Sequence, residues 1–482
     1  MVAPWVLEET QTADFHDRRL DDRFRTILSH LAERPVASIP AACGGHAETA
    51  AAYRFFDNDK TDLPSVLAPH REATRQRMRA QPVVLLVQDT SEIELTRPEQ
   101  QVVGTGPLQS STRVGVLLHL LHAFTPDGTP LGTVHADTWV RPPEPLSPEQ
   151  HASQRPIEEK ESQRWIDALR VAQAEGRCLP ETRIVCIADS EADIFELLVE
   201  AQAEPRTADW ILRAAQDRAL VPEESTATVS AHRLRERLLQ EPVRETRAIA
   251  VRGRPAKVSC CKRGREQPRQ SRTATVETRA ARVTLRPPWR PDRRLAEVTV
   301  NVVLVREVDP PAGEPPVEWL LLTSLPIGTL EEVRQVIQYY CGRWMVEVFF
   351  RTLKSGCRVE ARRFERLDRL LPCLGVYLIV AWRTLWVCRM GRSCPDLDCD
   401  AVFEPAEWQA VWQVVRREAP PTTPPKLRVM VRMVAQLGGY VNRPRTDEPG
   451  PQTVWLGLQR MHDLAQCWML FGPGARVEPK DV

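Results

Sequence analysis

One stretch of the chain, Glu331 to Lys354, holds four polar residues whose types and spacing could do chemistry together. The stretch lacks proline and carries one glycine, so it predicts one long helix. At about 100° per residue, offsets of 0, 3, 7 and 14 fall within roughly a 60° arc. These are the offsets of Tyr340, Arg343, Glu347 and Lys354. One helix face would then present a phenol, a guanidinium, a carboxylate and an ammonium.

The same spacing also fits a purely structural interpretation. Arg343 and Glu347 are four residues apart and could form an ordinary ion pair on a solvated helix face, worth a few tenths of a kcal/mol. The apolar residues of the stretch predict that the helix packs into a core and holds its polar row in place. These residues are Val336, Ile337, Val346, Phe349, Phe350 and Leu353.

The pattern Tyr-x2-Arg-x3-Glu-x6-Lys is similar to the signature of the insertion-sequence-four family of bacterial DDE transposases. The surrounding QYYCGRWMVEVFFRTLKSG resembles the Tn-five-like group of that family. In that family the glutamate is the third metal-binding carboxylate. The resemblance therefore implies two aspartates upstream, each at the end of a strand.

Two aspartates stand at such places. Val83 to Val87 is an apolar run of strand length, and Asp89 follows it closely. Arg183 to Ala188 is a second run, and Asp189 follows it in the sequence DSEAD, where the family has a DREAD-like sequence. An aspartate after a strand often forms only a turn or a cap. With the resemblance, Asp89 and Asp189 are the expected metal ligands beside the helical glutamate.

The segments between these residues predict an α/β fold. Gly115 to Phe124 and Leu131 to Val140 predict a β-meander, and Glu158 to Ala174 predicts a helix. Asp193 is expected to cap the helix that follows it. The order strand, Asp, meander, helix, strand, Asp and distant helical Glu is the plan of a ribonuclease-H-like catalytic core. Residues 208–325 alternate in the manner of an antiparallel sheet and match the family's all-β insertion.

Helical segments flank this core at both ends. DRRLDDRFRTILSHLAE has the spacing of one buried helix face, and AYRF is similar to a motif of the family's DNA-end-binding domain. Near the C-terminus, LGGY and TVWLGLQRMHDL resemble the family's dimerisation region. We therefore expect a helical DNA-end-binding domain at 1–80, the first part of the catalytic core at 81–207, the β insertion at 208–325, the second part of the core at 326–392 and a helical dimerisation domain at 393–482.

Charge argues against a uniformly basic nucleic-acid binder, because the net charge is only +1. Residues 1–80 hold 11 Lys and Arg against 12 Asp and Glu, whereas residues 251–300 hold 14 against 4. That local excess predicts a phosphate-binding patch, with a solvated arginine-rich face as the alternative. Arginine abundance alone carries no weight, since 58 Arg against 7 Lys are spread over the whole chain.

The remaining composition favours a cytoplasmic protein. The 12 cysteines lack paired zinc-ligand spacing with histidines, which argues against structural zinc. No uninterrupted apolar run approaches the length of a membrane span, and the N-terminus lacks the features of a secretory signal. We expect a bacterial cytoplasmic protein that is associated with the nucleoid when bound to DNA, with no membrane partner.

The resemblance implies a cut-and-paste DNA transposase. Asp89, Asp189 and Glu347 would hold two Mg²⁺ ions, for which Mn²⁺ can substitute, because oxygen-only ligands favour these ions over zinc. At 4 Å and an effective dielectric constant near 20, two carboxylates repel by roughly 4 kcal/mol, a cost that divalent cations remove. The implied sequence of steps is a nick, a hairpin at the transposon end, hairpin opening by water and strand transfer.

The partners implied are double-stranded DNA, as transposon terminal inverted repeats and as target DNA, and a second copy in a paired-end homodimer. The expected DNA-binding residues are Tyr340, Arg343, Lys354, Arg54 and Trp319, the last as the ring on which a flipped base stacks. Trp319 stands 28 residues before Glu347, at the family's spacing, although a strand tryptophan is usually core. His119 is a secondary candidate: in the family this position could approach the metal, but a histidine in an apolar strand is more often a satisfied core residue.

Two other functions stay open. A domesticated, non-catalytic DNA-binding or regulatory protein would not need three clustered carboxylates. A structure-selective nuclease of the same fold would lack the β insertion and the Tyr-Arg-Glu-Lys row. Inverted repeats flanking the coding sequence would separate all three functions.

Overall fold

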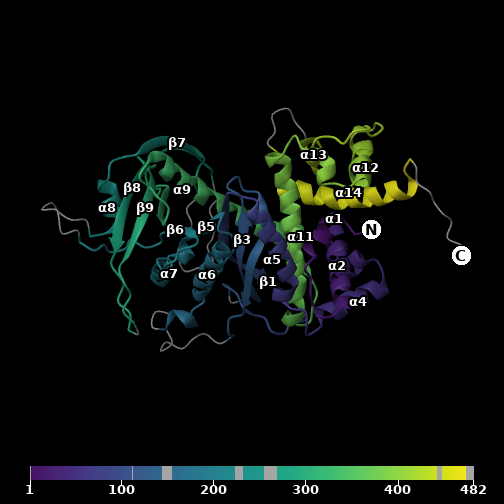
Figure 1. Cartoon of the computed structure of the whole chain (residues 1–482), viewed down its shortest axis with the longest axis horizontal. Helices are drawn as coiled ribbons and strands as arrows, with labels where there is room; N and C mark the ends of the chain where they lie inside the picture. The colour runs from purple at the N-terminus through teal and green to yellow at the C-terminus, as the bar shows by residue number, and fades with distance from the viewer. Residues whose placement is uncertain are drawn as a thin grey trace.

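The computed structural model describes residues 2–110, 112–143, 155–222, 232–253, 269–291, 293–441 and 448–473. One large mixed sheet crosses the described chain, and helical regions from both ends of the chain lie beside it (Figure 1). Its strands follow the order β2-β3-β1-β5-β6-β10-β9-β8-β7, and β4 also pairs with β3. The mixed α/β architecture with helical N-terminal and C-terminal regions agrees with the sequence prediction.

The first half of the sheet contains the predicted meander. β1 (Val83–Glu94), β3 (Val114–Phe124) and β4 (Pro130–Trp139) are antiparallel neighbours, and β2 (Gly106–Pro107) is a short addition to β3. β5 (Arg183–Ala188) pairs in parallel with β1, and β6 (Asp209–Arg213) pairs in parallel with β5. The connection from β4 to β5 contains the short helix η2 (Ile157–Glu159) and α6 (Gln163–Cys178). A crossover helix of this kind is what a parallel strand pair requires.

The second half of the sheet is an antiparallel ladder. β10 (Glu318–Thr323) joins β6 to β9 (Val298–Glu307), and β8 (Arg272–Leu285) and β7 (Glu245–Val251) follow. The predicted strands of this segment are thus present, except that the run at Ala256–Lys262 lies outside the described residues. One helix, α8 (Leu234–Gln240), interrupts the strands and was not predicted. Its Leu234 and Leu238 form a single buried i,i+4 pair, which is too short a pattern to distinguish from a strand.

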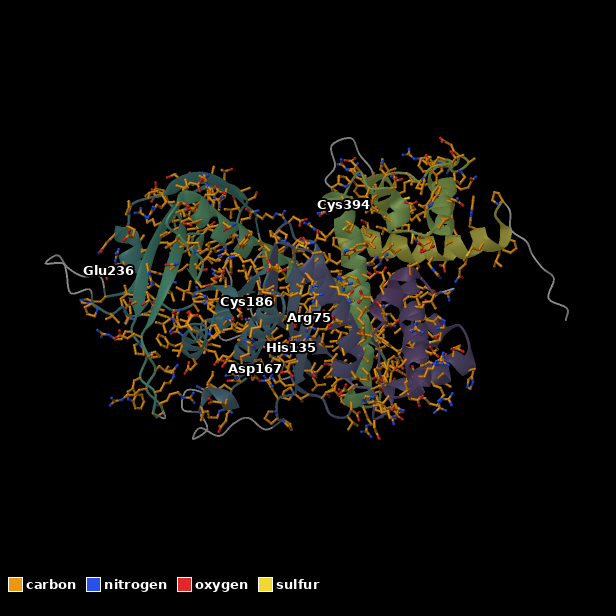
Figure 2. All side chains as sticks on the ribbon, viewed as in Figure 1. Arg75, His135, Asp167, Cys186, Glu236 and Cys394 are labelled. Carbon is orange, nitrogen blue, oxygen red and sulfur yellow. The ribbon has the colours of Figure 1, made fainter. Side chains whose placement is uncertain are left out.

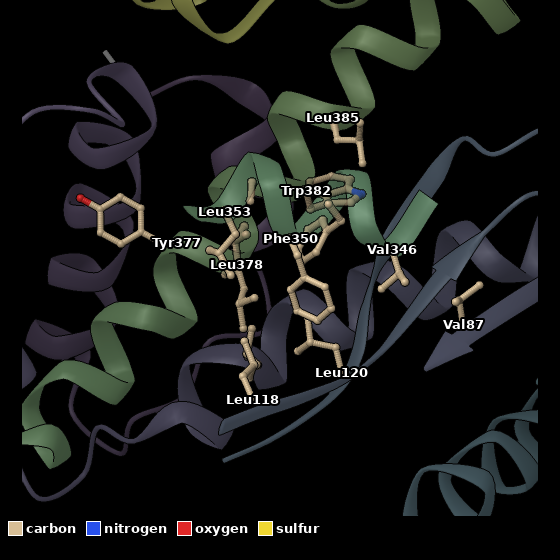
Figure 3. Close-up of a cluster of buried hydrophobic side chains, with 14 of the residues drawn as sticks. Val87, Leu118, Leu120, Val346, Phe350, Leu353, Tyr377, Leu378, Trp382 and Leu385 are labelled. Carbon is tan, nitrogen blue, oxygen red and sulfur yellow. The ribbon is translucent and has the colours of Figure 1, made fainter. Parts of the chain in front are cut away.

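The two faces of the sheet support separate cores. Successive side chains of a strand point to opposite faces. Val87 of β1 therefore faces one core together with Leu118 and Leu120 of β3, whereas Val84 and Leu86 face the other. Two helices, α10 (Trp344–Arg351) and α11 (Leu367–Ser393), cover the first core, as Figure 3 shows. The second core contains side chains of α6 and of α7 (Phe195–Glu200).

The predicted single helix from Glu331 to Lys354 is wrong in detail. The structure has α9 (Leu330–Gly342), then Arg343 at a junction, then α10 (Trp344–Arg351) and a π-helical turn, η4 (Thr352–Gly356). At the junction the amide of Arg343 donates to Tyr340 O at 3.1 Å, one residue short of the α-helical partner. A Cβ at Gly342 would lie 3.0 Å from Leu85 Cδ1, so the glycine allows the junction to approach β1. The polar row is therefore not a straight stripe.

Helices from both ends of the chain pack around α11 (Figure 1). The N-terminal group is α1 (Pro4–Glu9), α2 (Arg18–Glu33), α3 (Ile39–Cys43), α4 (His46–Phe56) and α5 (Leu63–Arg79). The C-terminal group is α12 (Pro405–Arg416), α13 (Leu427–Leu437) and α14 (Pro451–Phe471), and short turns η5 (Val359–Ala361) and η6 (Cys399–Ala401) flank α11. By length and composition α11 could cross a membrane, but 83% of its apolar window is buried in the protein. It is a core helix.

A buried polar network joins the N-terminal helices to the sheet. Glu9 of α1 accepts hydrogen bonds from His70 and from Arg77, the latter at 2.5 Å, and all but about 1% of Glu9 and His70 is buried. His70 Nε2 accepts the amide of Thr133 in β4 at 3.0 Å, which assigns the proton to Nδ1. Burial lowers the pKa of His70 despite the attraction of Glu9. A neutral histidine therefore links α1, α5 and β4.

Candidate active site

The parallel pairing of β1 and β5 brings Asp89 and Asp189 to one level of the sheet. Val87 is the partner of Ile187, and each aspartate stands two residues further along its chain. Asp189 follows β5, as predicted, and its carboxylate accepts the amide of Glu191 at 2.8 Å. Asp89 does not end its strand: β1 continues to Glu94, because β3 supplies partners for the polar residues as far as Gly115.

The helical glutamate reaches the same place through an arginine. Arg343 Nη1 donates to Asp89 Oδ2 at 3.3 Å, and Arg343 Nη2 donates to Glu347 Oε1 at 2.7 Å. The side chains of Arg343 and Asp89 are each 16% exposed, and that of Glu347 is 37% exposed. A solvated surface pair is therefore not what the structure contains, since the guanidinium bridges a strand and a helix 254 residues apart in the chain.

Asp89 is a buried carboxyl group with charged neighbours. Burial raises the pKa of Asp89 to about 7, and the negative charges of Asp189 and Glu347 add to this effect, while Arg343 opposes it. For Arg343, burial disfavours the charged form, but Tyr340, Asp89 and Glu347 outweigh it and raise the pKa. Shifted pKa values in a small group of titratable residues are typical of functional sites.

Apolar packing fixes the position of the glutamate relative to the strands. Val346, Phe350 and Leu353 of the α10 region point toward β1, β3 and α11, where Val87, Leu118, Leu120 and Trp382 lie (Figure 3). Val346 is next to Glu347 in the chain, and Val87 lies two residues before Asp89 on the same face of β1. The same core that buries α10 therefore holds the carboxylates in place.

Trp319 lies beside Tyr340. The two rings meet edge to face with centroids 5.4 Å apart, Tyr340 is buried, and Trp319 is half-buried on β10. Burial raises the pKa of Tyr340. Trp319 also lines a cavity of about 430 Å³, whose other lining residues include Arg213, Arg235 and Arg269. Glu314 and Glu318 line the same cavity, and Glu318 pairs with Arg235 at 2.8 Å, so the ring shares the hollow with both cations and carboxylates.

Three models of known families match the chain. Residues 2–61 match a model described as transposase DNA-binding, residues 159–371 match the transposase DDE domain, and residues 379–469 match the transposase Tn5 dimerisation domain. Together the three models match about three quarters of the chain, in this order. The chain belongs to the Tn5-type DDE transposases.

A solved structure similar to this transposase is a piggyBac transposase synaptic complex with hairpin DNA, determined by cryo-electron microscopy. The two chains share 10% identity over 82% of this chain and 73% of that chain, with a TM-score of 0.35.

Lys354 lies apart from the carboxylates of the transposase. It belongs to the π-helical turn η4, and its Nζ is 3.8 Å from Glu360 Oε1. Burial lowers the pKa of Lys354, although Glu360 opposes this shift.

A residue that sequence reasoning missed, Trp344, lies between Arg343 and Glu347 in the chain and is 59% exposed. The sequence held one signal for Trp344: it is a large apolar residue on the exposed side of the helix face that carries the predicted polar residues.

His119 does not join Asp89. It is paired with Thr90 in the β1–β3 register and faces α6, where its ring meets Trp165 at 4.7 Å. Its Nδ1 bonds with Thr90 Oγ1 at 2.8 Å and its Nε2 with Gln88 Oε1 at 3.2 Å. Burial lowers its pKa to about 3. On this face Gln88 also donates to Cys186 Sγ at 3.4 Å. Cys186 is labelled in Figure 2. His119 is therefore a satisfied core residue.

Two further sequence predictions meet different surroundings. Asp193 does not cap α7, whose first turn begins after Ile194; its carboxylate instead accepts the amides of Ala215 and Gln216 and the guanidinium of Arg218. The reason is long-range, since a buried arginine on a later segment needs a partner. Arg54 is exposed on α4, which packs on α2, α3 and α11 rather than on the sheet.

The basic segment 251–300 is partly neutralised where the structure describes it. Arg272 pairs with Glu307 and Glu314, and three other arginines of the segment pair with carboxylates, one within the segment and two elsewhere in the fold. These are the pairs Arg279–Glu277, Arg290–Glu196 and Arg293–Glu158. The net excess counted along the sequence is therefore larger than the free positive charge on the described surface.

The donor set at Asp89 suits a hard divalent cation. All the candidate ligands are carboxylate oxygens, which bind Mg²⁺ and Mn²⁺ in preference to softer metals. In the part of the chain that the structure describes, no three His, Cys, Asp or Glu side chains are gathered closely enough to hold a metal ion. The positive charge among the carboxylates is instead that of Arg343. Burial is the largest cause of the raised pKa of Asp89, the charges of Asp189 and Glu347 add to it, and the one guanidinium does not restore the ordinary value.

Proposed function

We propose that this protein is a cut-and-paste DNA transposase whose catalytic carboxylates are Asp89, Asp189 and Glu347. The observation that carries the proposal is the convergence of Asp89 and Glu347 on Arg343, at the level of the parallel sheet where Asp189 also stands. The three carboxylates would hold two Mg²⁺ ions, for which Mn²⁺ can substitute. When bound, such ions activate a water or a DNA 3′-OH and stabilise the leaving oxygen.

The chain's own residues have distinct tasks in this proposal. Arg343 and Lys354 bind phosphates of the transposon end, and Tyr340 positions the DNA backbone beside them. Asp89 must lose its proton before it can bind a cation, because the carboxylate and not the carboxylic acid is the ligand. Val346 and Phe350 keep Glu347 at a fixed distance from β1, so that little rearrangement is needed when DNA arrives.

A ribonuclease-H-like core is the fold that we propose for the catalytic part. In support, the strands β4, β3, β1, β5 and β6 lie side by side in that order, with the first three antiparallel and the last two parallel to β1. The domain divisions proposed from sequence follow: 81–207 and 326–392 form this core, 208–325 is the β-rich insertion, and 1–80 and 393–482 are the DNA-end-binding and dimerisation domains.

In the proposed hairpin intermediate, Trp319 and Trp344 are the rings on which an extruded base stacks. A tight DNA turn requires a base to leave the stack, which costs a few kcal/mol, and stacking on an aromatic ring returns about 1–3 kcal/mol. Trp319, beside the hollow lined by arginines, is the proposed stacking ring. Trp344, exposed on the helix of Glu347, is a second surface on which an extruded base or its neighbour can stack.

The partners follow from the same function. We propose that terminal inverted repeats and target DNA are the substrates, with Arg54 contacting the ends, and that two copies pair two ends as a homodimer. The proposed location is the bacterial cytoplasm, with association with the nucleoid through bound DNA.

Three single substitutions test the proposed function. Asp89→Asn, Asp189→Asn and Glu347→Gln keep side-chain shape and remove ligand charge, so each should abolish cleavage of a labelled transposon end while end binding stays within a few-fold. Glu331→Gln is the matched control, because Glu331 is an 85% exposed carboxylate on α9 outside the proposed triad. Cleavage within tenfold of wild type would remove the substituted residue from the triad, and such activity in all three variants would reject the function.

A further inference from the structure

Arg343 occupies the position between two carboxylates where a divalent cation would have to bind. Its guanidinium contacts Asp89 at 3.3 Å and Glu347 at 2.7 Å, and its side chain is largely buried. We propose that Arg343 is an exchangeable internal cation: it neutralises Asp89 and Glu347 in the metal-free protein, and metal ions and DNA together transfer its guanidinium to a DNA phosphate. This inference rests on the proposed function of the three carboxylates.

Competition between the two cations follows from the contacts. A carboxylate oxygen that accepts from the guanidinium offers fewer lone pairs to a metal ion, and two cations on the same oxygens repel each other. In the partly buried site, breaking the ion pair without replacing it leaves unpaired charges, which is costly. The guanidinium therefore leaves the carboxylates most easily when a metal ion takes its place.

A phosphate is the second partner that the guanidinium can accept. Its planar fork matches carboxylate and phosphate geometry equally well, so one side chain can serve both states. Arg343 lies at the junction of α9 and α10, where its amide bonds to Tyr340 O and its side chain lies beside Tyr340. At the junction the exchange needs only side-chain motion, since neither helix depends on the guanidinium for its backbone hydrogen bonds.

The exchange makes metal binding and DNA binding mutually favourable. Metal ions release Arg343 for the phosphate, and the phosphate removes Arg343 from the carboxylates, so each ligand should raise the affinity for the other by the same factor. Without the arginine this coupling should vanish. Metal binding in the absence of DNA should then become tighter, because its internal competitor is gone.

Mn²⁺ binding to DNA-free protein at pH 8 tests the first half of the proposal, with free Mn²⁺ measured by electron paramagnetic resonance. Arg343→Ala should lower the Mn²⁺ Kd by threefold or more. Arg334→Ala, which removes a positive charge from α9 but no contact to the three carboxylates, should leave the Kd unchanged, because Arg334 pairs with Glu245. An unchanged or higher Kd in Arg343→Ala, or an equal decrease in Arg334→Ala, would overturn the proposal.

Affinity for a transposon end with and without Ca²⁺ tests the second half. Ca²⁺ should tighten the binding of a transposon end by wild type several-fold. In Arg343→Ala the ratio of the Kd without Ca²⁺ to the Kd with Ca²⁺ should fall to about one. A ratio that survives the substitution overturns the exchange. The variant Asp89→Asn distinguishes failure of the exchange from failure of the proposed function. If Asp89→Asn abolishes Mn²⁺ binding while Arg343→Ala binds Mn²⁺ like wild type, the proposed function stands and the exchange fails. If Asp89→Asn binds Mn²⁺ like wild type, the proposed function fails.

Discussion

Asp89 combines burial with two neighbouring negative charges, and this combination decides how the site responds to protons and cations. A carboxyl group with a pKa of about 7 is half-protonated at neutral pH, although its ordinary value is near 3.8. Arg343 alone does not restore the ordinary value. A divalent cation bound at Asp89 would favour the carboxylate over the carboxylic acid and so lower this pKa.

The first prediction concerns the stability of the metal-free protein. Between about pH 4 and pH 7 the folded state keeps a proton on Asp89 that the unfolded chain has released, so the free energy of unfolding should fall as pH rises through this window. The full loss is at most about 4 kcal/mol. In EDTA, Asp89→Asn should therefore raise Tm above that of wild type at pH 8, and much less at pH 5. An equal difference in Tm between Asp89→Asn and wild type at both pH values would contradict the raised pKa of Asp89.

A second prediction separates stacking by Trp319 from core packing. Trp319→Ala should leave the initial nick almost untouched and slow hairpin formation by one to two orders of magnitude, because about 1.36 kcal/mol corresponds to a factor of ten in rate. Phenylalanine should restore much of the rate and leucine little, since the effect depends on an aromatic face. If a folded alanine variant slows both steps equally, Trp319 is only a packing residue against Tyr340.

Among the elements, those with a strong local pattern could be predicted from sequence and those shaped by distant partners could not. β5 has an uninterrupted apolar run and α2 has an amphipathic period, so both elements lie where predicted. The polar residues after Val87 look like a turn, yet they continue β1 because β3 pairs with them. Likewise, the junction at Arg343 depends on Asp89 and Leu85, which no local pattern around residue 343 contains. The catalytic roles of Asp89, Asp189 and Glu347 were predicted from the family signature and stay predictions, although the structure brings Asp89 and Glu347 to one guanidinium.

Helix packing in the C-terminal region gives a third prediction. A Cβ at Gly457 of α14 would lie 1.8 Å from Val434 O of α13, so the two helices touch through backbone. Gly457→Ala should force them apart and cost about 1–3 kcal/mol, seen as a lower Tm and faster proteolysis between α13 and α14. Gly450→Ala is the control, because a Cβ there meets nothing within 4 Å. Identical behaviour of the two variants would refute the close packing.

Over the whole molecule, α14 connects the two ends of the chain. It packs on α12 and α13, and it contacts α2 through His462 with Glu33 at 3.1 Å and Asp463 with Arg34 at 3.7 Å. Its last residues leave a large apolar surface: Met469, Leu470 and Phe471 are 61%, 57% and 80% exposed. An apolar helix end in a region that matches a dimerisation domain is suited to bind a second copy.

The fourth prediction therefore concerns pairing of two ends. Leu470→Glu with Phe471→Glu should leave single-end binding intact and abolish the paired complex, because two charges would be buried in the interface. Light scattering of the DNA-bound protein measures the assembly. Leu239→Glu, at an exposed leucine of α8, is the control. Normal paired complexes from the double variant would show that the dimer uses another surface.

The most direct measurement of the central claim replaces the proposed Mg²⁺ by Fe²⁺ and maps where the polypeptide is cut by locally generated hydroxyl radicals. If Asp89, Asp189 and Glu347 hold the ions, wild type should be cut near residues 89, 189 and 347, three places far apart in the chain. Excess Mg²⁺ should suppress all three cuts together, and Asp89→Asn should weaken all three. Cuts at other places, or cuts near these residues that Asp89→Asn and Mg²⁺ leave unchanged, would contradict a shared metal site.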